Sequence, residues 1–485
     1  MKRLLVSIAA LSVLACSAPG PTPAAKPAEI PITSKSPQAV DQFKKGRDLV
    51  ENLRLPEAIQ ALDEALKLDP DFAQAHTYRG FATSGPEGLK EMERAGELSA
   101  ALPKPEQLVV EAFLAGGRGE SAKSADLWRQ LTDAVPGDWR AWAGLGAQLY
   151  AAQKYGDAID ALKKATTLNP KAGPAYNMLG YAHLVQGEAG PAIEALKQYA
   201  GANPDEPNPQ DSLGEALMAG GQFAEAETAF RKAVTLSPAF YVALEGVAYT
   251  KAFQRDWAGA REALKQALAA ASRPSDKFEV QSLESAVTFA EGKAADGMKQ
   301  LDMLEKSPDA SAVDAAFVPI YRASALVDAS RYREAEVQIA KALQTADAGA
   351  LPPSVTRSVR RNALALRAAT EGRSGNAAAA EKTAAALQQD ATARPDDAPL
   401  QSSVHFAQGM LATARKDLKA ARGHFDLCSN QDEYCHWQAF VVAQKGGDRE
   451  GADAARARIV KAYVRSPAYL VARSSLNRMA PKAMN

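Results

Sequence analysis

Residues 139–170 read WRAWAGLGAQLYAAQKYGDAIDALKKATTLNP, and this stretch decides the fold. Its last residue is one of four prolines that recur every 34 residues, at Pro136, Pro170, Pro204 and Pro238. Pro274 and Pro308 repeat the interval after a slip of two residues. Self-similarity at a fixed period of this size is the signature of a repeat architecture. We therefore expect an array of similar units.

Each unit has the pattern of two antiparallel helices. With Trp139 counted as position 1, small residues stand at positions 8, 20 and 27, as Gly146, Ala158 and Ala165. Two helices approach closely only where such small residues meet, and larger residues at positions 4, 7 and 24 fill the gaps between them. Pro170, at position 32, cannot continue the second helix because it lacks an N–H group.

The same residue types recur at these positions over four contiguous units, and this pattern resembles the tetratricopeptide repeat. The resemblance implies an all-α fold, an α-solenoid (superhelix) of helix-turn-helix repeats. We expect the solenoid over residues 39–345, with a shortened unit at 73–100, and degenerate tetratricopeptide-like repeats with a basic capping helix over residues 346–485. Residues 344–356 are rich in Gly and Pro, which predicts a break between two solenoid segments.

The N-terminus has the pattern of an export signal. In residues 1–15, Met-Lys-Arg precedes an apolar stretch that is too short to cross a bilayer as a helix. The sequence Val-Leu-Ala-Cys, which ends at Cys16, resembles the lipobox of bacterial lipoproteins. The resemblance implies cleavage before Cys16 and a diacylglycerol on its thiol, and Ser17 favours the outer membrane, facing the periplasm. The alternative is an ordinary secretory signal that contains a cysteine near its cleavage site.

Residues 16–38 contain six prolines and several Ala and Ser residues. Proline at this density favours an extended chain, so we expect a tether that holds the body away from the membrane. A Pro-x-x-Pro interaction motif is the alternative.

Composition argues against several functions. Lys+Arg and Asp+Glu both total 57, and this balance is unlike the basic excess of nucleic-acid binders. The sequence has no His-Glu-x-x-His motif, P-loop or Gly-x-Ser-x-Gly nucleophile elbow. We therefore expect no enzyme activity, no cofactor and no nucleic-acid partner.

His424, Cys428, Cys435 and His436 form the one dense group of metal-ligating residues. In an exported protein, the two cysteines are expected to form a disulfide. Two free or buried thiols and a zinc site are the alternatives.

The resemblance also implies a concave groove, lined by positions 2, 5, 9, 12 and 13 of each first helix. In this sequence the predicted partner-binding residues at those positions are Arg140, Tyr150, Asn177, Tyr181, Met218, Glu245, Tyr249 and Phe253. Packing between neighbouring repeats is the alternative role for each of them. Ala143 and Ala147 depart from the clamp that binds acidic C-terminal peptides in related proteins, so such a ligand is not expected.

The last 37 residues carry eight basic side chains and only two acidic ones, Glu450 and Asp453. The basic residues are Arg449, Arg456, Arg458, Lys461, Arg465, Arg473, Arg478 and Lys482. They could contact anionic lipid headgroups or an acidic partner, or they could form a solvated helical face.

These observations predict a non-catalytic scaffold or adaptor lipoprotein of the bacterial cell envelope. Its partners would be proteins or peptides bound in the groove, and its contact with the membrane would be the lipid on Cys16. The alternative is a glycan-binding module of a polysaccharide or of a secretion or pilus assembly system.

Overall fold

The structure is a computed structural model that describes residues 29–479, except 53, 84, 308–309, 396 and 463–464. Over these residues the regular structure is entirely helical, as expected, with 25 α-helices and one short 3-10 helix. The expected signal peptide, Cys16 and the tether as far as residue 28 lie outside the described residues. None of the described helices combines the length and the apolar character that a membrane span requires.

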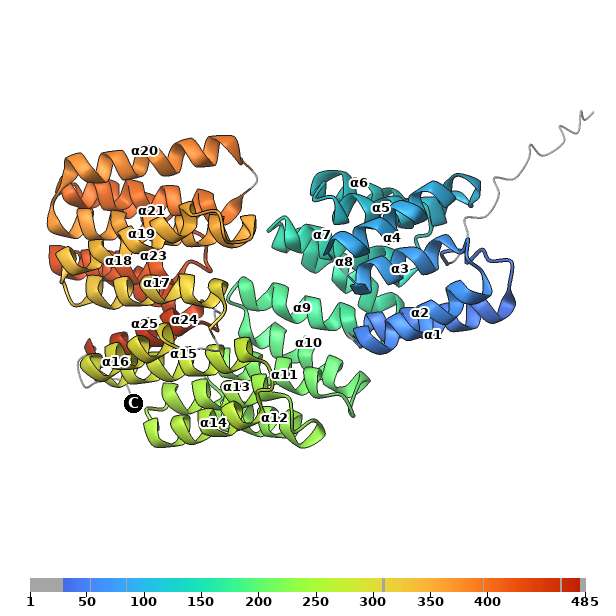
Figure 1. The fold of residues 1–485 in the computed structure, drawn as a ribbon, viewed down its shortest axis with the longest axis horizontal. Helices are drawn as coiled ribbons and strands as arrows, with labels where there is room; N and C mark the ends of the chain where they lie inside the picture. Colours follow the sequence, from blue (N-terminus) through green and yellow to red (C-terminus); the bar gives the residue numbers. More distant parts are fainter. Residues whose placement is uncertain are drawn as a thin grey trace, which may run out of the picture.

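The first fourteen helices form seven pairs in chain order, and each pair packs on the next (Figure 1). Their bounds are α1 (Pro37–Glu51), α2 (Leu55–Leu68), α3 (Ala73–Thr83), α4 (Gly85–Leu98), η1 (Ser99–Ala101), α5 (Lys104–Gly117), α6 (Ser121–Ala134), α7 (Trp139–Ala151), α8 (Tyr155–Leu168), α9 (Gly173–Val185), α10 (Ala189–Ala202), α11 (Pro207–Ala219), α12 (Phe223–Leu236), α13 (Tyr241–Phe253) and α14 (Trp257–Ala270).

The remaining helices continue the array, with longer helices from α19 to α21. Their bounds are α15 (Pro274–Glu291), α16 (Ala294–Glu305), α17 (Ala312–Asp328), α18 (Tyr332–Asp347), α19 (Pro353–Ser374), α20 (Ala377–Ala393), α21 (Ala398–Ala414), α22 (Leu418–Phe425), α23 (Glu433–Gly446), α24 (Arg449–Lys461) and α25 (Pro467–Met479).

The close approach of the two helices within each pair explains why small residues recur at the same positions along the chain. A Cβ atom added to Gly146 would lie 2.6 Å from Leu162, and one added to Gly180 would lie 2.4 Å from Leu196. Real Cβ atoms do not come so close to another side chain, so only glycine fits at these two helix crossings. The small residue predicted at position 8 therefore sets the distance between the two helices of a unit.

The shortened unit at residues 73–100 also forms a helix pair, α3 and α4. Its backbones come into contact, because a Cβ on Gly80 would lie 2.5 Å from the carbonyl oxygen of Gly88. The next helix begins at Gly85, which has a φ of +62° that few other residues adopt. The connection between these two helices is therefore shorter than in the regular units, and Gly80 and Gly88 allow the helices to approach closely.

The first helix of each pair lies on the inner side of the curved array. α7 contacts α9, α9 contacts α11, and α11 contacts α13, although each of these pairs is two helices apart along the chain. Among the described helices, no comparable contact joins successive second helices such as α8 and α10. First helices are therefore closer to one another than second helices are, which gives the array an inner wall. We call the side of these first helices that carries positions 2, 5, 9, 12 and 13 the inner face.

The break expected at residues 344–356 does not interrupt the packing. The boundary at residue 345 falls inside α18, and α18 packs against α19. One apolar cluster extends from Ala316 on α17 to Val442 on α23 and includes Ala346 and Leu351. The regular and the degenerate repeats therefore share one continuous core.

The far end of the array returns to its middle. α25 packs against α15 and also contacts α13, and Figure 1 shows α25 beside α15. Apolar residues of α9–α15 and of α23–α25 belong to one buried cluster, which includes Tyr469, Leu470 and Leu476 of α25. The inner face of α11–α15 is thus covered by a segment more than 170 residues further along the chain.

Residues 30–35 lie against the body, so the expected tether does not extend over them. Ile30 N–H donates to Asp138 Oδ2 at 2.8 Å, and Gln74 Nε2 donates to the carbonyl oxygen of Pro31 at 2.7 Å. Lys35 N–H donates to Asp69 Oδ2 at 2.8 Å. Proline favours an extended chain, but it does not prevent that chain from pairing with polar groups of the body.

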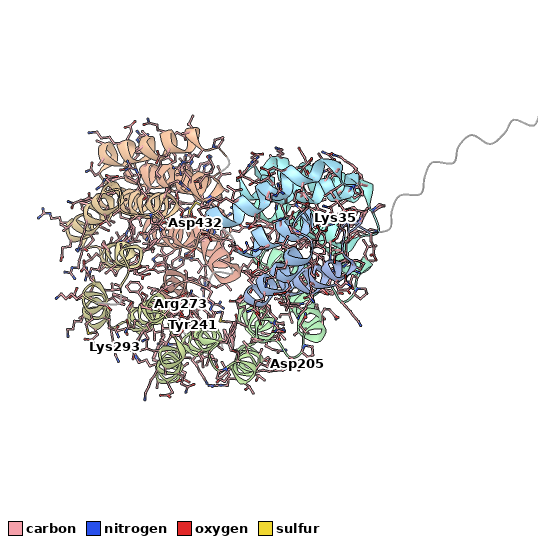
Figure 2. All side chains as sticks on the ribbon, turned by 45° about the vertical axis from the view of Figure 1, so that its right-hand side comes forward. Lys35, Asp205, Tyr241, Arg273, Lys293 and Asp432 are labelled. Carbon is pink, nitrogen blue, oxygen red and sulfur yellow. A yellow bond between two sulfur atoms is a disulfide. The ribbon has the colours of Figure 1, made fainter. Side chains whose placement is uncertain are left out.

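Thr33 and Ser34 complete this extended segment. Both the N–H and the hydroxyl group of Thr33 donate to Glu106, and the Ser34 hydroxyl donates to Asp69 Oδ2 at 2.6 Å. Figure 2 shows Lys35 on the helical body, where its ammonium group pairs with Asp71 at 2.9 Å. We call residues 30–35 the N-terminal segment.

Candidate peptide-binding inner face

The eight predicted partner-binding residues occur on four successive first helices, α7, α9, α11 and α13. Those on α7 and α9 are partly exposed, whereas those on α11 and α13 are buried. The same repeat positions therefore differ in access to solvent along the array.

Arg140 on α7 pairs with α1 across the inner face. Its Nε lies 2.5 Å from Glu51 Oε1, and its guanidinium group lies 4.6 Å from the ring centre of Trp139. Burial raises the pKa of Glu51, although Arg140 opposes this change. Tyr150, at the other end of α7, stacks edge-on against Tyr155, and burial raises the pKa of Tyr150.

Asn177 and Tyr181 belong to α9. The Oδ1 atom of Asn177 is buried and has no hydrogen-bond partner in the structure. The Tyr181 hydroxyl donates to Glu215 Oε2 at 2.7 Å, which links α9 to α11. Burial, followed by the charge of Glu215, raises the pKa of Tyr181 well above its usual value.

Met218, Glu245, Tyr249 and Phe253 belong to the same buried region as α25. Tyr249 is 3% exposed and Phe253 is 8% exposed. The prediction that these four residues form an accessible partner-binding surface is wrong for the structure as it stands. The physical reason is that residues 465–479, which we call the C-terminal segment, cover the inner face at this point.

Arg465 of the C-terminal segment points into a group of carboxylates on the inner face. Its Nη1 atom lies 2.8 Å from Glu215 Oε1 and 3.6 Å from Asp211 Oδ2, and its Nη2 atom lies 3.9 Å from Glu245 Oε2. Nη2 also donates to the carbonyl oxygen of Val242. We call Asp211, Glu215 and Glu245 the acid site.

Three carboxyl groups and one guanidinium group share this buried place, so the charges are unbalanced when all three carboxyl groups are ionised. Burial raises the pKa of Asp211 to about 7 and that of Glu245 to about 8, although Arg465 opposes both changes. Burial also opposes the charge of Arg465, but the three carboxylates raise its pKa well above the usual value. Asp211 Oδ1 and Glu245 Oε1 are buried without a hydrogen-bond partner. The acid site therefore has accepting capacity that Arg465 does not use.

Aromatic rings hold the C-terminal segment next to the acid site. The ring of Tyr469 meets that of Phe253 edge-on, with 5.8 Å between the ring centres. The Arg473 guanidinium lies 4.7 Å from the centre of the Phe253 ring, and it donates to the Tyr469 hydroxyl oxygen at 2.9 Å. Guanidinium groups and edge-on rings both favour the faces of aromatic rings.

The sequence prediction missed Asp211 as a site residue and gave Arg465 no specific partner. Asp211 and Glu215 occupy positions 5 and 9 of their unit, and Glu245 occupies position 5 of the next. Three acidic residues on one face at these positions indicate a need for a cation. Arg465 is 250 residues from Glu215, so no periodic pattern connects the two.

The cysteine pair lies apart from the inner-face residues. The sulfur atoms of Cys428 and Cys435 are joined as a disulfide between α22 and α23, with 6.6 Å between the Cα atoms. Both ring nitrogens of the neighbouring His436 are buried without a side-chain partner, and burial lowers its pKa. Among the described residues, no three His, Cys, Asp or Glu side chains are arranged to hold a metal ion.

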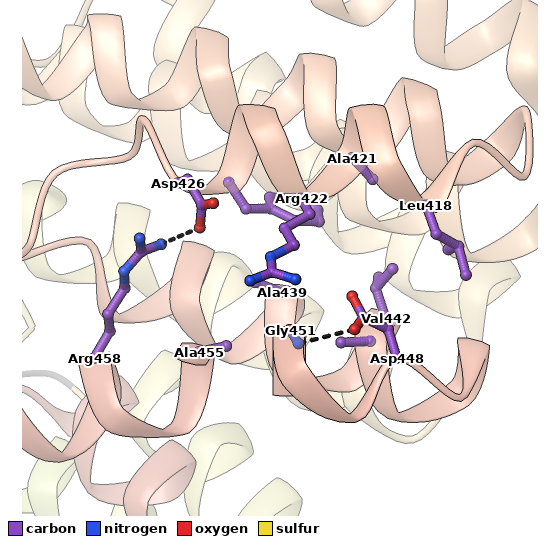
Figure 3. A pocket seen from close by; sticks show the side chains of 12 residues that line it. Leu418, Ala421, Arg422, Asp426, Ala439, Val442, Asp448, Gly451, Ala455 and Arg458 are labelled. Carbon is purple, nitrogen blue, oxygen red and sulfur yellow. Dashed lines mark hydrogen bonds and ion pairs between the residues drawn. The ribbon is translucent and has the colours of Figure 1, made fainter. Parts of the chain in front are cut away.

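Figure 3 shows a small pocket between α22, α23 and α24. Arg458 pairs with Asp426 at 2.7 Å at one side of it, and apolar side chains such as Leu418 and Val442 form much of the remaining wall. None of the predicted partner-binding residues lines this pocket. It therefore does not add to the inner face.

Solved structures similar to this chain share low sequence identity with it. MamA from Desulfovibrio magneticus is 19% identical, and the match covers 35% of this chain and 97% of that chain with a TM-score of 0.33. YrrB, described as a TPR protein with an unusual peptide-binding site, is 20% identical, with coverage of 37% and 91% and a TM-score of 0.31. A tetratricopeptide repeat protein from Parabacteroides merdae is 13% identical, with coverage of 54% and 99% and a TM-score of 0.42.

Family models give the more specific result. No curated protein matches the chain in sequence. Four models described as the tetratricopeptide repeat or TPR repeat match residues 46–83, 110–172, 149–215 and 211–240. The matched residues extend from the second half of α1 to the end of α3 and from α5 to the region after α12. This chain is a tetratricopeptide-repeat protein.

Proposed function

We propose that this protein is a non-catalytic scaffold of the bacterial cell envelope that binds protein or peptide partners on its inner face. One observation carries the proposal. The inner face of α11–α15 already holds a stretch of polypeptide, the C-terminal segment, through side chains at the repeat positions used for binding. A surface that binds a segment of its own chain has the shape and chemistry to bind a segment of another protein.

Phe81 is the best site from which to test for a partner. It stands at position 9 of α3, so it corresponds to Tyr181 and Tyr249, but its side chain is 45% exposed. Its ring meets that of Phe113, at position 9 of the next unit, edge-on with 5.5 Å between centres. Exposed aromatic side chains are frequent anchors in protein interfaces.

A photo-crosslinking amino acid at Phe81 in intact cells tests the scaffold function. We expect one dominant protein adduct, identified by mass spectrometry. The matched control is the same probe at Leu68, which is 49% exposed on the second helix α2. The absence of any protein adduct, or the same adducts from both positions, would count against binding on the inner face.

The location in the envelope has a separate test, because Cys16 lies outside the described residues. If Cys16 is lipidated, metabolic labelling with a fatty acid marks the wild-type protein and leaves Cys16→Ser unlabelled. The variant is expected to leave the membrane fraction. A matched Ser17→Ala change should keep both the label and the membrane association. An unlabelled wild-type protein would leave the scaffold proposal intact and remove the lipid anchor from it.

The glycan-binding alternative gains no support from Tyr249 and Phe253. Such a site needs aromatic rings that face solvent. Tyr249 and Phe253 are buried under the C-terminal segment instead.

A further inference from the structure

We propose that the acid site is a receptor for an arginine-bearing, cationic peptide of a partner protein, and that the C-terminal segment is its resident occupant, which the partner displaces. This inference rests on the proposed function, since it names the chemistry of the partner and the way in which access to the inner face is controlled. Three features of the structure support it.

The first feature is the way α25 is held. In the regular units, a first helix packs extensively on the second helix before it, as α9 does on α8 and α13 on α12. α25 contacts α24 only weakly and makes its main contact with α15, ten helices earlier. Its release therefore need not unstack the neighbouring pair, α23 and α24.

The second feature is the register of the docked side chains. Arg465 enters the acid site, Tyr469 meets Phe253, and Arg473 covers the same Phe253 ring. Tyr469 and Arg473 are four residues apart on α25, so they share one side of that helix, and Arg465 lies two residues before its first residue. The partner that fits has an arginine, an aromatic residue four positions later and a second arginine after four more.

The third feature is the unused capacity of the acid site. Asp211 Oδ1 and Glu245 Oε1 are both buried and lack a donor, while one guanidinium group faces three carboxylates. An unsatisfied buried acceptor costs free energy, so the resident segment is not the best ligand for this site. A partner peptide that brings a further N–H donor or a second cation would satisfy these atoms.

The C-terminal segment competes with a partner peptide for the acid site, and it has an advantage because it belongs to the same chain. A tethered segment competes at an effective concentration on the order of millimolar. A free peptide therefore binds the wild-type chain weakly, because its affinity is reduced by the small fraction of chains that are open. Weakening the resident segment should raise the affinity of the same peptide without any change in the acid site.

The test uses the full chain and a fluorescent peptide with the sequence of residues 465–479, RSPAYLVARSSLNRM. In the Arg465→Glu variant, the new carboxylate is repelled by the acid site, and we expect the peptide to bind at least about tenfold more tightly than to the wild type. Adding Glu215→Gln to this variant should remove the gain. A peptide in which the first arginine is replaced by glutamine should bind about tenfold more weakly.

Arg449→Glu is the matched control, because Arg449 is an exposed residue of α24 and the change in charge is the same. It should bind the peptide as weakly as the wild type does. Tyr469→Ala is a second variant that loosens the segment without altering Arg465, and it should also raise the affinity. Circular dichroism checks that each variant is folded.

Equal, weak binding by the wild type, Arg465→Glu and Tyr469→Ala would overturn the inference. So would the loss of folded structure in both variants, because the segment would then be a fixed part of the core. Neither result bears on the adduct expected from Phe81. A chain that captures a partner at Phe81 but does not bind the peptide would refute this inference and leave the scaffold function in place.

Discussion

The N-terminal and C-terminal segments both bind to the side of the array where the first helix of each pair lies, but the body recognises the two segments differently. In the N-terminal segment, backbone groups make many of the contacts: the N–H groups of Ile30, Thr33 and Lys35 donate to carboxylates, and the Pro31 carbonyl accepts from Gln74. In the C-terminal segment, the guanidinium of Arg465 and the ring of Tyr469 carry the contact.

This difference has consequences for specificity. Backbone groups are the same in every residue except proline, so recognition through them tolerates many sequences. Recognition through a guanidinium group and aromatic rings requires particular side chains at particular positions. We therefore expect substitutions in the C-terminal segment to have larger effects than substitutions in the N-terminal segment.

Tyr469→Ala should have the largest effect. The Tyr469 ring is buried against Phe253 and Arg473. Removal of a buried aromatic side chain should weaken the docking of the C-terminal segment by about 3 to 4 kcal/mol. We expect hydrogen exchange of the α25 amides to become faster while that of the α7 amides stays unchanged. Ala468→Ser, on the exposed side of α25, should leave both unchanged. Protection of α25 equal to that of the wild type would show that Tyr469 does not hold the segment.

Glu106→Ala tests the N-terminal segment from the side of the body. Glu106 is fully buried and accepts from Thr33 and from Gln74, so its removal leaves buried donors unpaired at a cost of about 2 to 3 kcal/mol. We expect trypsin to cleave faster after Lys35. The control Glu111→Ala, on the same helix, should leave the cleavage rate unchanged.

Thr33→Ala separates the side-chain contribution from the backbone contribution to binding of the N-terminal segment. It removes one hydroxyl but keeps the N–H that donates to Glu106, so we expect a loss of only about 1 kcal/mol. An effect of Thr33→Ala as large as that of Glu106→Ala would mean that side-chain recognition dominates here too.

The last prediction concerns pH. Because they are buried, Asp211 has a pKa of about 7 and Glu245 has a pKa of about 8 in the folded chain. In the unfolded chain, the pKa of each carboxyl group is near 4. Between these values the folded state binds more protons, so the free energy of unfolding should fall as the pH rises from about 5 to about 8. The slope is at most about 1.4 kcal/mol per pH unit for each group.

Urea unfolding of the wild type and of Glu245→Gln at several pH values measures this slope. The variant should be less dependent on pH, because one of the two groups no longer titrates. Arg465, Glu279 and Asp276 also face Glu245 and are unchanged in the comparison. Parallel stability curves for the two proteins would contradict the expected role of Glu245.

The repeat pattern predicted the fold well because each constraint acts within one unit. Gly146 and Leu162 are 16 residues apart, and their contact recurs with the period of the sequence. The docking of the two segments could not be predicted in this way. Arg465 and Glu215 are 250 residues apart, and Ile30 and Asp138 are 108 apart, so each pairing depends on the curvature summed over many units.

The predicted site residues show the same limit. Positions 5 and 9 place Tyr181, Glu245 and Tyr249 on the inner face of their helices, because the spacing of residues within one helix determines which of them share a face. Whether this face is open depends on α25, which belongs to a part of the chain where the repeat pattern is weak. The basic residues near the C-terminus left anionic lipid, an acidic partner and a solvated helical face as alternatives, and Arg465 pairs with carboxylates of the same chain.

The N-terminal segment runs backward along the array, from Asp138 at the start of α7 to Asp69 before α3. Tension transmitted through the chain upstream of residue 29 therefore enters the body at the fourth helix pair. The terminal pair, α1 and α2, has a neighbouring pair on only one side and would be the first to fray under load. Ile30, Pro31 and Thr33 bind to the body before the chain reaches α1. Their contacts therefore bear the tension, and the tension does not separate α1 and α2 from the end of the array.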